Sequence, residues 1–187
     1  LDETPVTRYQ EHGIFLHELG HALGLQHGGD SDLNFKPNYQ SVMNYLYTEW
    51  GIPRFGDPFP GDYHYSNALP TPLNTIDETH LDESLGFKPV VPADTVLKFR
   101  YAGAPELYRI QPLVPVDMDC DGARTERQRA IDVTPDDPNT PPRRLHTFDD
   151  LNHLLFMVIG GRIAAFLWWF DRRVIDDTVN DVATETV

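Results

Sequence analysis

The chain of 187 residues has little cysteine and few basic side chains, and each shortage excludes a class of protein. Cys120 is the only cysteine, so no disulfide can form within the chain, and Cys120 is either a free thiol or pairs outside it. Fifteen basic residues stand against 29 acidic ones, which gives a formal net charge of −14. Such a surface repels nucleic acids and anionic membranes, so we expect neither as a partner.

Long stretches suited to helices are also scarce in the middle of the chain. Of the 16 prolines, 14 lie between Pro53 and Pro142, which excludes long helices there and predicts a loop-rich middle. The length and the hydrophobic content of 40% fit one folded region with its own core. We assign residues 1–177 to this region and expect residues 178–187 to form a flexible tail.

Two helices are predicted. The first covers residues 8–25, where Gly24 marks its end. The second is short and covers residues 76–85, because Thr75 and Glu78 have the spacing of a capping box.

Apolar residues near the C-terminal end and in the proline-rich middle predict further elements. Residues 96–101 and 107–110 are typical of short strands. Residues 151–170 are mostly apolar and predict a buried helix or helix-turn. A membrane span over Leu154–Phe170 is the alternative, but the run is short and contains a glycine pair and Arg162, and a charge within a span is unfavourable.

The strongest pattern in the sequence is a set of three histidines, His17, His21 and His27. The first two are four residues apart on the predicted helix, so both imidazoles project from one face and can share a tetrahedral zinc ion. His27 cannot reach the metal by continuing the helix. Gly24 solves this by allowing a left-handed turn that brings His27 back toward the metal.

Glu18 directly follows the first histidine and is the candidate general base. Three histidines leave the fourth zinc position open for water, as in catalytic rather than structural sites. Glu18 is placed to take the proton of that water as it attacks a peptide carbonyl. The alternative is a set of ordinary histidines on an amphipathic helix. It is disfavoured because the five-position pattern arises by chance in such a chain well under about once in ten thousand.

The histidine motif, together with the sequence Ser41–Tyr45, resembles the metzincin family of zinc metallopeptidases. The resemblance implies an α+β, zincin-like fold, here mainly its loop-rich lower C-terminal subdomain. It also implies a turn in which Met43 forms an apolar floor beneath the imidazoles. Tyr45 matches the tyrosine that astacin-like and serralysin-like members place beside the metal, where it stabilises the oxyanion of the substrate.

Further short blocks, including Leu81–Glu83 and Asp149–Asn152, resemble a group of little-characterised secreted bacterial and archaeal metzincins. Gly28, after the third histidine, differs from the residue typical of astacins, serralysins or matrixins. Metzincins have an upper subdomain before the zinc helix, whereas only residues 1–8 precede the helix here. The resemblance to secreted members implies that this chain is secreted. Because only residues 1–8 precede the helix, we expect the upper subdomain to come from a separate N-terminal fragment of the same precursor or from another polypeptide.

A second metal site is predicted in an acidic turn. Three aspartates at alternate positions precede a glycine, namely Asp117, Asp119, Asp121 and Gly122. This is the beginning of a calcium loop, but Gln128 stands where an EF-hand has its bidentate glutamate, so Glu126 or Asp132 would have to close the shell. A solvated acidic turn without calcium is the alternative. The pair Asp149 and Asp150 is expected to provide surface charge or caps.

The sequence thus predicts a secreted zinc endopeptidase that acts on protein or peptide substrates and also binds calcium. The competing hypothesis is a non-catalytic module, derived from a metzincin, that keeps a metal site for structure or interaction. The retained Glu18 and the open three-histidine set favour the enzyme.

Overall fold

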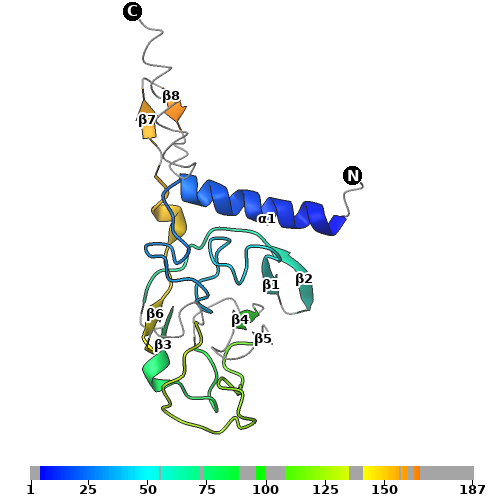
Figure 1. The fold of residues 1–187 in the computed structure, drawn as a ribbon, viewed down its shortest axis with the longest axis vertical. Coiled ribbons are helices and arrows are strands. Elements are labelled where there is room, and N and C mark those ends of the chain that lie inside the picture. The colour runs from blue at the N-terminus through cyan, green and yellow to red at the C-terminus, as the bar shows by residue number, and fades with distance from the viewer. Residues whose placement is uncertain are drawn as a thin grey trace, which may run out of the picture.

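The computed structural model describes residues 5–54, 56–71, 74–88, 96–99, 108–134, 141–155, 157–159 and 162–164. Within these ranges the chain forms one α-helix, α1 (Pro5–Ala22), and four antiparallel pairs of short strands (Figure 1). The pairs are β1 (Ile52–Arg54) with β2 (Asp57–Asp62), β3 (Thr75–Asp77) with β6 (Arg144–His146), β4 (Leu97–Phe99) with β5 (Tyr108–Ile110), and β7 (Met157–Ile159) with β8 (Arg162–Ala164). Two single-turn 3-10 helices, η2 (Glu78–His80) and η3 (Asp150–Asn152), complete this mixed α+β arrangement.

The predicted first helix is confirmed as α1, although it begins at Pro5 and ends at Ala22. Proline is favourable at a first helical position because its missing N–H has no partner there. At the other end Gly24 has a φ of +92°, as the sequence predicts. The Leu25 N–H then bonds to the Gly20 carbonyl over 3.0 Å, which closes a Schellman motif and turns the chain back along the helix.

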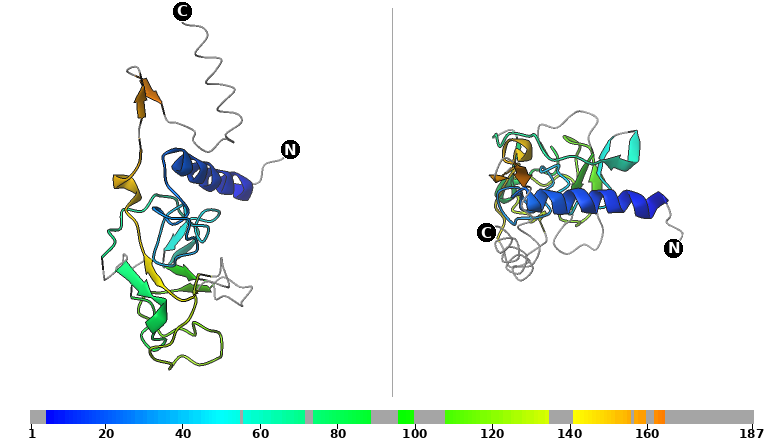
Figure 2. Two further views of the ribbon diagram at one scale, coloured as in Figure 1. Left: turned by 60° about the vertical axis from the view of Figure 1, so that its left-hand side comes forward. Right: turned by 90° about the horizontal axis from the view of Figure 1, so that it is seen from above.

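Two glycines let α1 lie directly on the loops beneath it. Gly13 and Gly20 are seven residues apart and therefore share one face of the helix. A Cβ at Gly13 would lie 2.0 Å from the Thr48 carbonyl oxygen, and one at Gly20 would lie 2.2 Å from the Met43 Sδ. The view from above in Figure 2 shows α1 running across the molecule, and in Figure 1 the β1–β2 pair lies beneath its N-terminal half.

The largest hydrophobic core lies around the β3–β6 and β4–β5 pairs rather than under α1. Its buried members are Ile76, Leu81, Phe87, Leu97, Phe99, Val116, Met118, Ile131, Val133 and Leu145. A smaller cluster of Leu25, Tyr39 and Met43 lies next to the C-terminal end of α1. The helix is therefore held by loop contacts and tyrosine hydrogen bonds, such as that from the Tyr65 hydroxyl to the Leu16 carbonyl over 2.6 Å.

The predicted helix over 76–85 is wrong, because this segment forms β3, η2 and a turn. Glu78 does not cap a helix that begins at Thr75. It is fully buried, and its carboxylate accepts hydrogen bonds from the backbone N–H groups of Val133 over 2.8 Å and Arg143 over 3.0 Å. Distant donors thus determine the local structure.

The two predicted strands in the proline-rich middle are confirmed as β4 and β5, which pair with Leu97 opposite Ile110. The predicted helix over 151–170 is wrong in the residues that the structure describes. After η3 they form the β7–β8 pair, with the glycine pair of the sequence between the strands. Residues 165–187, including the tail predicted at 178–187, lie outside the described residues. Among the described residues, no helix has the length and hydropathy needed to cross a membrane.

Candidate metal centre

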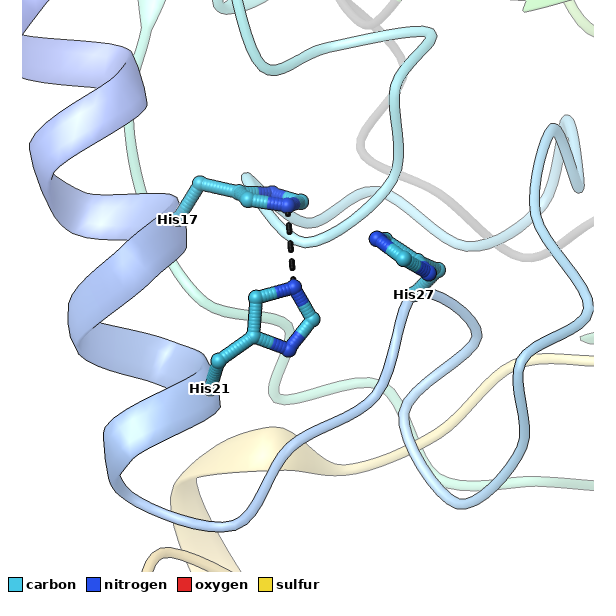
Figure 3. A group of neighbouring side chains, drawn as sticks. All are labelled: His17, His21 and His27. Carbon is cyan, nitrogen blue, oxygen red and sulfur yellow. Dashed lines mark hydrogen bonds between the residues drawn. The ribbon is translucent and has the colours of Figure 1, made fainter. Parts of the chain in front are cut away.

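The three histidines of the motif converge at the end of α1. His17 and His21 project from neighbouring turns of the helix, and His27 approaches from the loop that follows it (Figure 3). Each ring offers a nitrogen that lies within 4.8 Å of those of the other two. The Nε2 atoms of His17 and His21 are 3.1 Å apart. We call these three residues the metal centre.

Backbone carbonyls set the orientation of the two helical imidazoles. The Nδ1 of His17 lies 3.0 Å from the Val42 carbonyl oxygen, and the Nδ1 of His21 lies 2.9 Å from that of Leu25. A carbonyl only accepts, so we assign the proton of each ring to Nδ1, which leaves a lone pair on each Nε2. Two facing lone pairs cannot form a hydrogen bond. Nitrogens bound to one tetrahedral zinc at 2.0–2.1 Å are about 3.3 Å apart, which is close to the observed separation.

His27 supplies independent support for a bound cation. Its Nε2 is buried and has no hydrogen-bond partner in the described part of the chain. Its Nδ1 lies 3.6 Å from the Asp32 carboxylate, which is too long for a strong hydrogen bond but favours a proton on that nitrogen. A buried acceptor without a partner is unfavourable, and a cation held by all three imidazoles would remove that penalty.

The surroundings of His17 and His27 favour the neutral form of both imidazoles. Burial lowers the pKa of His17 and of His27, and the neighbouring histidines lower both further. Glu18 opposes this effect through its negative charge, but its influence is smaller than that of burial. At neutral pH both rings are therefore in the uncharged form that binds metals.

Met43 and Tyr45, the two further residues that the family resemblance singles out, both lie near this group. Met43 is fully buried, and its sulfur packs against the α1 backbone at Gly20, between the two helical histidines in the sequence. Tyr45 is half-exposed, with its ring centroid 5.2 Å from that of His17 and 4.7 Å from that of His27. The structure thus places the sulfur of Met43 against α1 at Gly20 and the aromatic ring of Tyr45 beside two of the three imidazoles.

A cavity of about 530 Å³ opens next to the metal centre. One wall is α1, which contributes Ile14, His17 and the exposed Glu18, and the other wall is the segment 45–50 with Phe35. Glu18 and Tyr45 therefore line one space, together with the His17 imidazole and several apolar and aromatic side chains. Such a cleft can hold an extended chain and expose it to a carboxylate and a phenol.

A family model for Peptidase M66 matches residues 4–68. The match covers α1, the three histidines, Met43 and Tyr45, and it supports a peptidase. No curated protein and no solved structure gives a significant match to the chain.

Asp150 lies outside the segment matched by Peptidase M66 but supports the loop within it. It is fully buried, so the expectation of a surface charge or cap is wrong for Asp150. It accepts hydrogen bonds from the Tyr39 hydroxyl over 2.6 Å, the Ser41 hydroxyl over 2.5 Å and the Ser66 N–H over 2.8 Å. Asp149, by contrast, does cap η3. No local pattern reveals the role of Asp150, because all three donors lie more than 80 residues away.

Buried Lys36 also helps to hold the loop between His27 and Met43 in place. Lys36 donates from Nζ to the Gly28 carbonyl over 2.7 Å and to the His146 carbonyl over 2.8 Å. Burial lowers the pKa of Lys36 to about 8, and the nearby carboxylates of Asp30 and Asp150 oppose that effect. The loop between His27 and Met43 is therefore held by buried charged groups rather than by regular secondary structure.

The predicted calcium loop is only partly as expected. Ligand atoms of Asp117, Asp119 and Asp121 do lie within 4.8 Å of one another. Asp132 is not part of this group, because its carboxylate accepts hydrogen bonds from the backbone N–H and hydroxyl of Thr134. A second set that shares Asp119 contains Glu126 and also Glu83, a residue that sequence analysis did not connect with metal binding.

Proposed function

We propose that this chain is a zinc-dependent endopeptidase of the metzincin type that cleaves protein or peptide substrates. The observation that carries the proposal is the convergence of His17, His21 and His27 beside a cleft that also contains Glu18. The Peptidase M66 match over this region supports the peptidase part of the proposal. Neutral imidazole nitrogens are ligands that suit zinc, and the inferred lone pairs fit a tetrahedral ion.

His17, His21 and His27 would hold the ion and leave one coordination position free. Bound zinc supplies a Lewis acid that polarises a peptide carbonyl and makes water acidic enough to attack at neutral pH. Because Glu18 is exposed within the cleft, it can take the proton from the attacking water and pass it to the leaving amine. The Tyr45 hydroxyl would donate a hydrogen bond to the oxyanion that develops on the substrate.

The apolar walls of the cleft support an extended peptide as the substrate. Phe35, Leu46 and Trp50 are among the residues that line the cleft. They offer apolar surface to a substrate side chain, while Glu18 and Tyr45 remain accessible to the scissile bond. A cleft of this composition excludes part of the water around the reacting groups, which strengthens the hydrogen bond from Tyr45.

The decisive experiment replaces Glu18 by alanine. We expect Glu18→Ala to bind zinc in the same stoichiometry as the wild type but to lose at least ~100-fold of its casein hydrolysis. Metal content by mass spectrometry separates the two effects. Glu11→Ala is the matched control, because Glu11 is an exposed glutamate two turns earlier on α1 and does not line the cleft.

Two results would count against the proposal. Undiminished hydrolysis by Glu18→Ala would remove Glu18 from the mechanism. A wild-type chain that binds zinc but cleaves neither casein nor gelatin would instead indicate the non-catalytic metal-binding module. Hydrolysis that a chelator stops and added zinc restores is the outcome that the proposal requires.

A further inference from the structure

A second group of carboxylates lies outside the metal centre, where Glu83 meets the loop 117–126. We call this segment the acidic loop. Ligand atoms of Glu83, Asp119 and Glu126 lie within 4.8 Å of one another. Glu83 comes from the turn after η2, more than 30 residues before the acidic loop, so the fold rather than the local sequence brings these carboxylates together.

Backbone hydrogen bonds hold Glu83 at the base of the acidic loop. Its N–H donates to the Glu126 carbonyl over 3.0 Å, and its carbonyl accepts from the Val116 N–H over 3.0 Å. Leu81 and Arg129 exchange two further backbone hydrogen bonds of 2.9 Å. Both ends of the acidic loop are therefore attached to the segment 81–83, which fixes the position of the Glu83 side chain.

One oxygen of the Glu83 carboxylate is an acceptor without a hydrogen-bond partner in the described part of the chain. The side chain is fully buried, and its Oε1 accepts from the Met118 N–H over 2.6 Å. Its Oε2 is buried without a hydrogen-bond partner, and so is the Oε2 of Glu126. Carboxylate oxygens that are shielded from water and unpaired are unfavourable, and a cation or a proton held by the two side chains would remove that penalty.

Glu78 shows that this arrangement is not common to every buried glutamate of the chain. Glu78 is equally buried, but its Oε1 accepts from Val133 and Thr134, and its Oε2 accepts from Arg143. Its hydrogen bonds therefore account for both oxygens. In Glu83, hydrogen bonds account for one oxygen and leave the other without a partner, in a carboxylate that lies close to those of Asp119 and Glu126.

Arg129 does not neutralise the carboxylates of Glu83, Asp119 and Glu126. Its Nη1 donates to the Oε1 of Glu126 over 2.9 Å, and its Nη2 lies 4.0 Å from the Asp119 carboxylate. Its side chain is 55% exposed, so it approaches the carboxylates from the solvent side. One guanidinium also cannot balance three carboxylates.

We propose that Glu83, Asp119 and Glu126 bind one calcium ion. Calcium accepts six to eight oxygen ligands in irregular geometry, including bidentate carboxylates, whereas magnesium requires an octahedron and retains most of its water. The proposal changes the ligand set expected from the sequence. Asp117 accepts from the N–H groups of Asp121 over 3.1 Å and Gly122 over 2.9 Å, so its main role is to shape the acidic loop.

The proposed ion has a structural role. Leu81, Val116 and Met118 belong to the largest hydrophobic core, and each lies next to one of the segments that the ion would join. Calcium would thus connect the turn at Glu83 to the acidic loop and hold both against the core. This role is independent of the peptidase reaction.

Calorimetric titration of calcium into the full chain, at fixed zinc content, tests the proposal. We expect one calcium per chain, much weaker binding of magnesium, and a Tm that rises by roughly 5–10 °C at calcium concentrations of about 100 times the Kd. Glu83→Gln should weaken calcium binding at least tenfold. Glu78→Gln is the matched control, because it should lower the Tm of the calcium-free chain and leave the calcium affinity unchanged.

Glu126→Gln provides a second variant if Glu83→Gln does not fold, since the Glu126 side chain lies nearer to solvent, with 22% of its surface exposed. It should also weaken calcium binding at least tenfold. The proposal is overturned if the wild-type chain binds no calcium. It is also overturned if Asp121→Asn abolishes binding while Glu83→Gln and Glu126→Gln keep the wild-type affinity.

Discussion

Replacing Asp150 by asparagine tests whether one buried carboxylate holds the loop that carries Met43. The substitution keeps the size of the side chain but removes its charge and turns one acceptor into a donor. Three donors now bond to the carboxylate: the hydroxyls of Tyr39 and Ser41 and the N–H of Ser66. Each of the first two belongs to the segment that precedes Met43.

The geometry of the donors determines the expected loss of stability. Ser41 and Ser66 share one oxygen of Asp150, and the Ser66 N–H can only donate, so the amide oxygen of asparagine must take that position. The amide NH2 then faces the Tyr39 hydroxyl, which loses its acceptor. Hydrogen bonds to charged groups contribute about 1.5–3 kcal/mol and neutral ones about 0.5–1.5 kcal/mol. The bonds from Ser41 and Ser66 become weaker because their acceptor loses its charge, and the bond from Tyr39 is lost. Together these changes give a destabilisation of about 2–4 kcal/mol.

Thermal unfolding and zinc competition measure the two consequences. We expect the Tm of Asp150→Asn to fall by roughly 5–15 °C. We also expect zinc affinity to fall about 10–100-fold, as for other losses of support around a metal site, because the Val42 carbonyl that orients His17 lies on the same loop. Asp149→Asn is the control, because its carboxylate caps η3 and should contribute only about 1 kcal/mol.

The reasoning about Asp150 is refuted by a specific result. If Asp150→Asn unfolds within about 0.5 kcal/mol of the wild type and binds zinc equally well, the three hydrogen bonds do not hold the loop. If Asp149→Asn lowers zinc affinity as much as Asp150→Asn, the effect belongs to the whole η3 region rather than to the buried carboxylate.

Three further predictions concern other contacts of the same region. Gly13→Ala should destabilise the chain by about 1–2 kcal/mol in urea unfolding, since the overlap with the Thr48 carbonyl outweighs the gain in helix propensity; a more stable variant would contradict the close contact. Tyr45→Phe should lower kcat by up to ~100-fold with little change in KM or zinc content, and an unchanged kcat would exclude the hydroxyl from oxyanion stabilisation. Because the pKa of Lys36 is lowered to about 8 in the folded chain, the unfolded chain binds more protons between about pH 8 and its ordinary pKa of 10.5. The contribution of Lys36 to stability should therefore rise between about pH 8 and pH 10.5, by about 3 kcal/mol, and Lys36→Met should abolish this rise.

The parts of the fold that sequence analysis predicted correctly depend on short-range order. The α1 helix and its end at Gly24 follow from contacts between residues at most five apart. The positions of His17, His21 and His27 follow from the same helix and turn. The strands β4 and β5 were recognisable because β-branched and aromatic residues occur between proline-rich segments.

The errors occurred where distant partners decide the local structure. Residues 76–85 have a helical capping pattern, but Ile76 pairs with Leu145 in the β3–β6 ladder, and the Glu78 carboxylate bonds to the backbone of Val133 and Arg143. These partners are more than 50 residues away, so no local pattern reveals them. The apolar run 151–170 likewise lacks the information that distinguishes a buried helix from the β7–β8 pair.

Buried carboxylates were the hardest feature to predict, because in a chain with a net charge of −14 any single acid is expected at the surface. Glu78, Glu83 and Asp150 are all fully buried, yet their numbers of hydrogen-bond partners differ. Hydrogen bonds to Glu78 and Asp150 account for both oxygens of each carboxylate, which makes these residues connectors between distant segments. Glu83 alone among these three keeps a buried oxygen without a partner. The Nε2 of His27 is likewise an unused acceptor shielded from water, and at both proposed metal sites such an atom belongs to a residue that lies within a group of potential metal ligands.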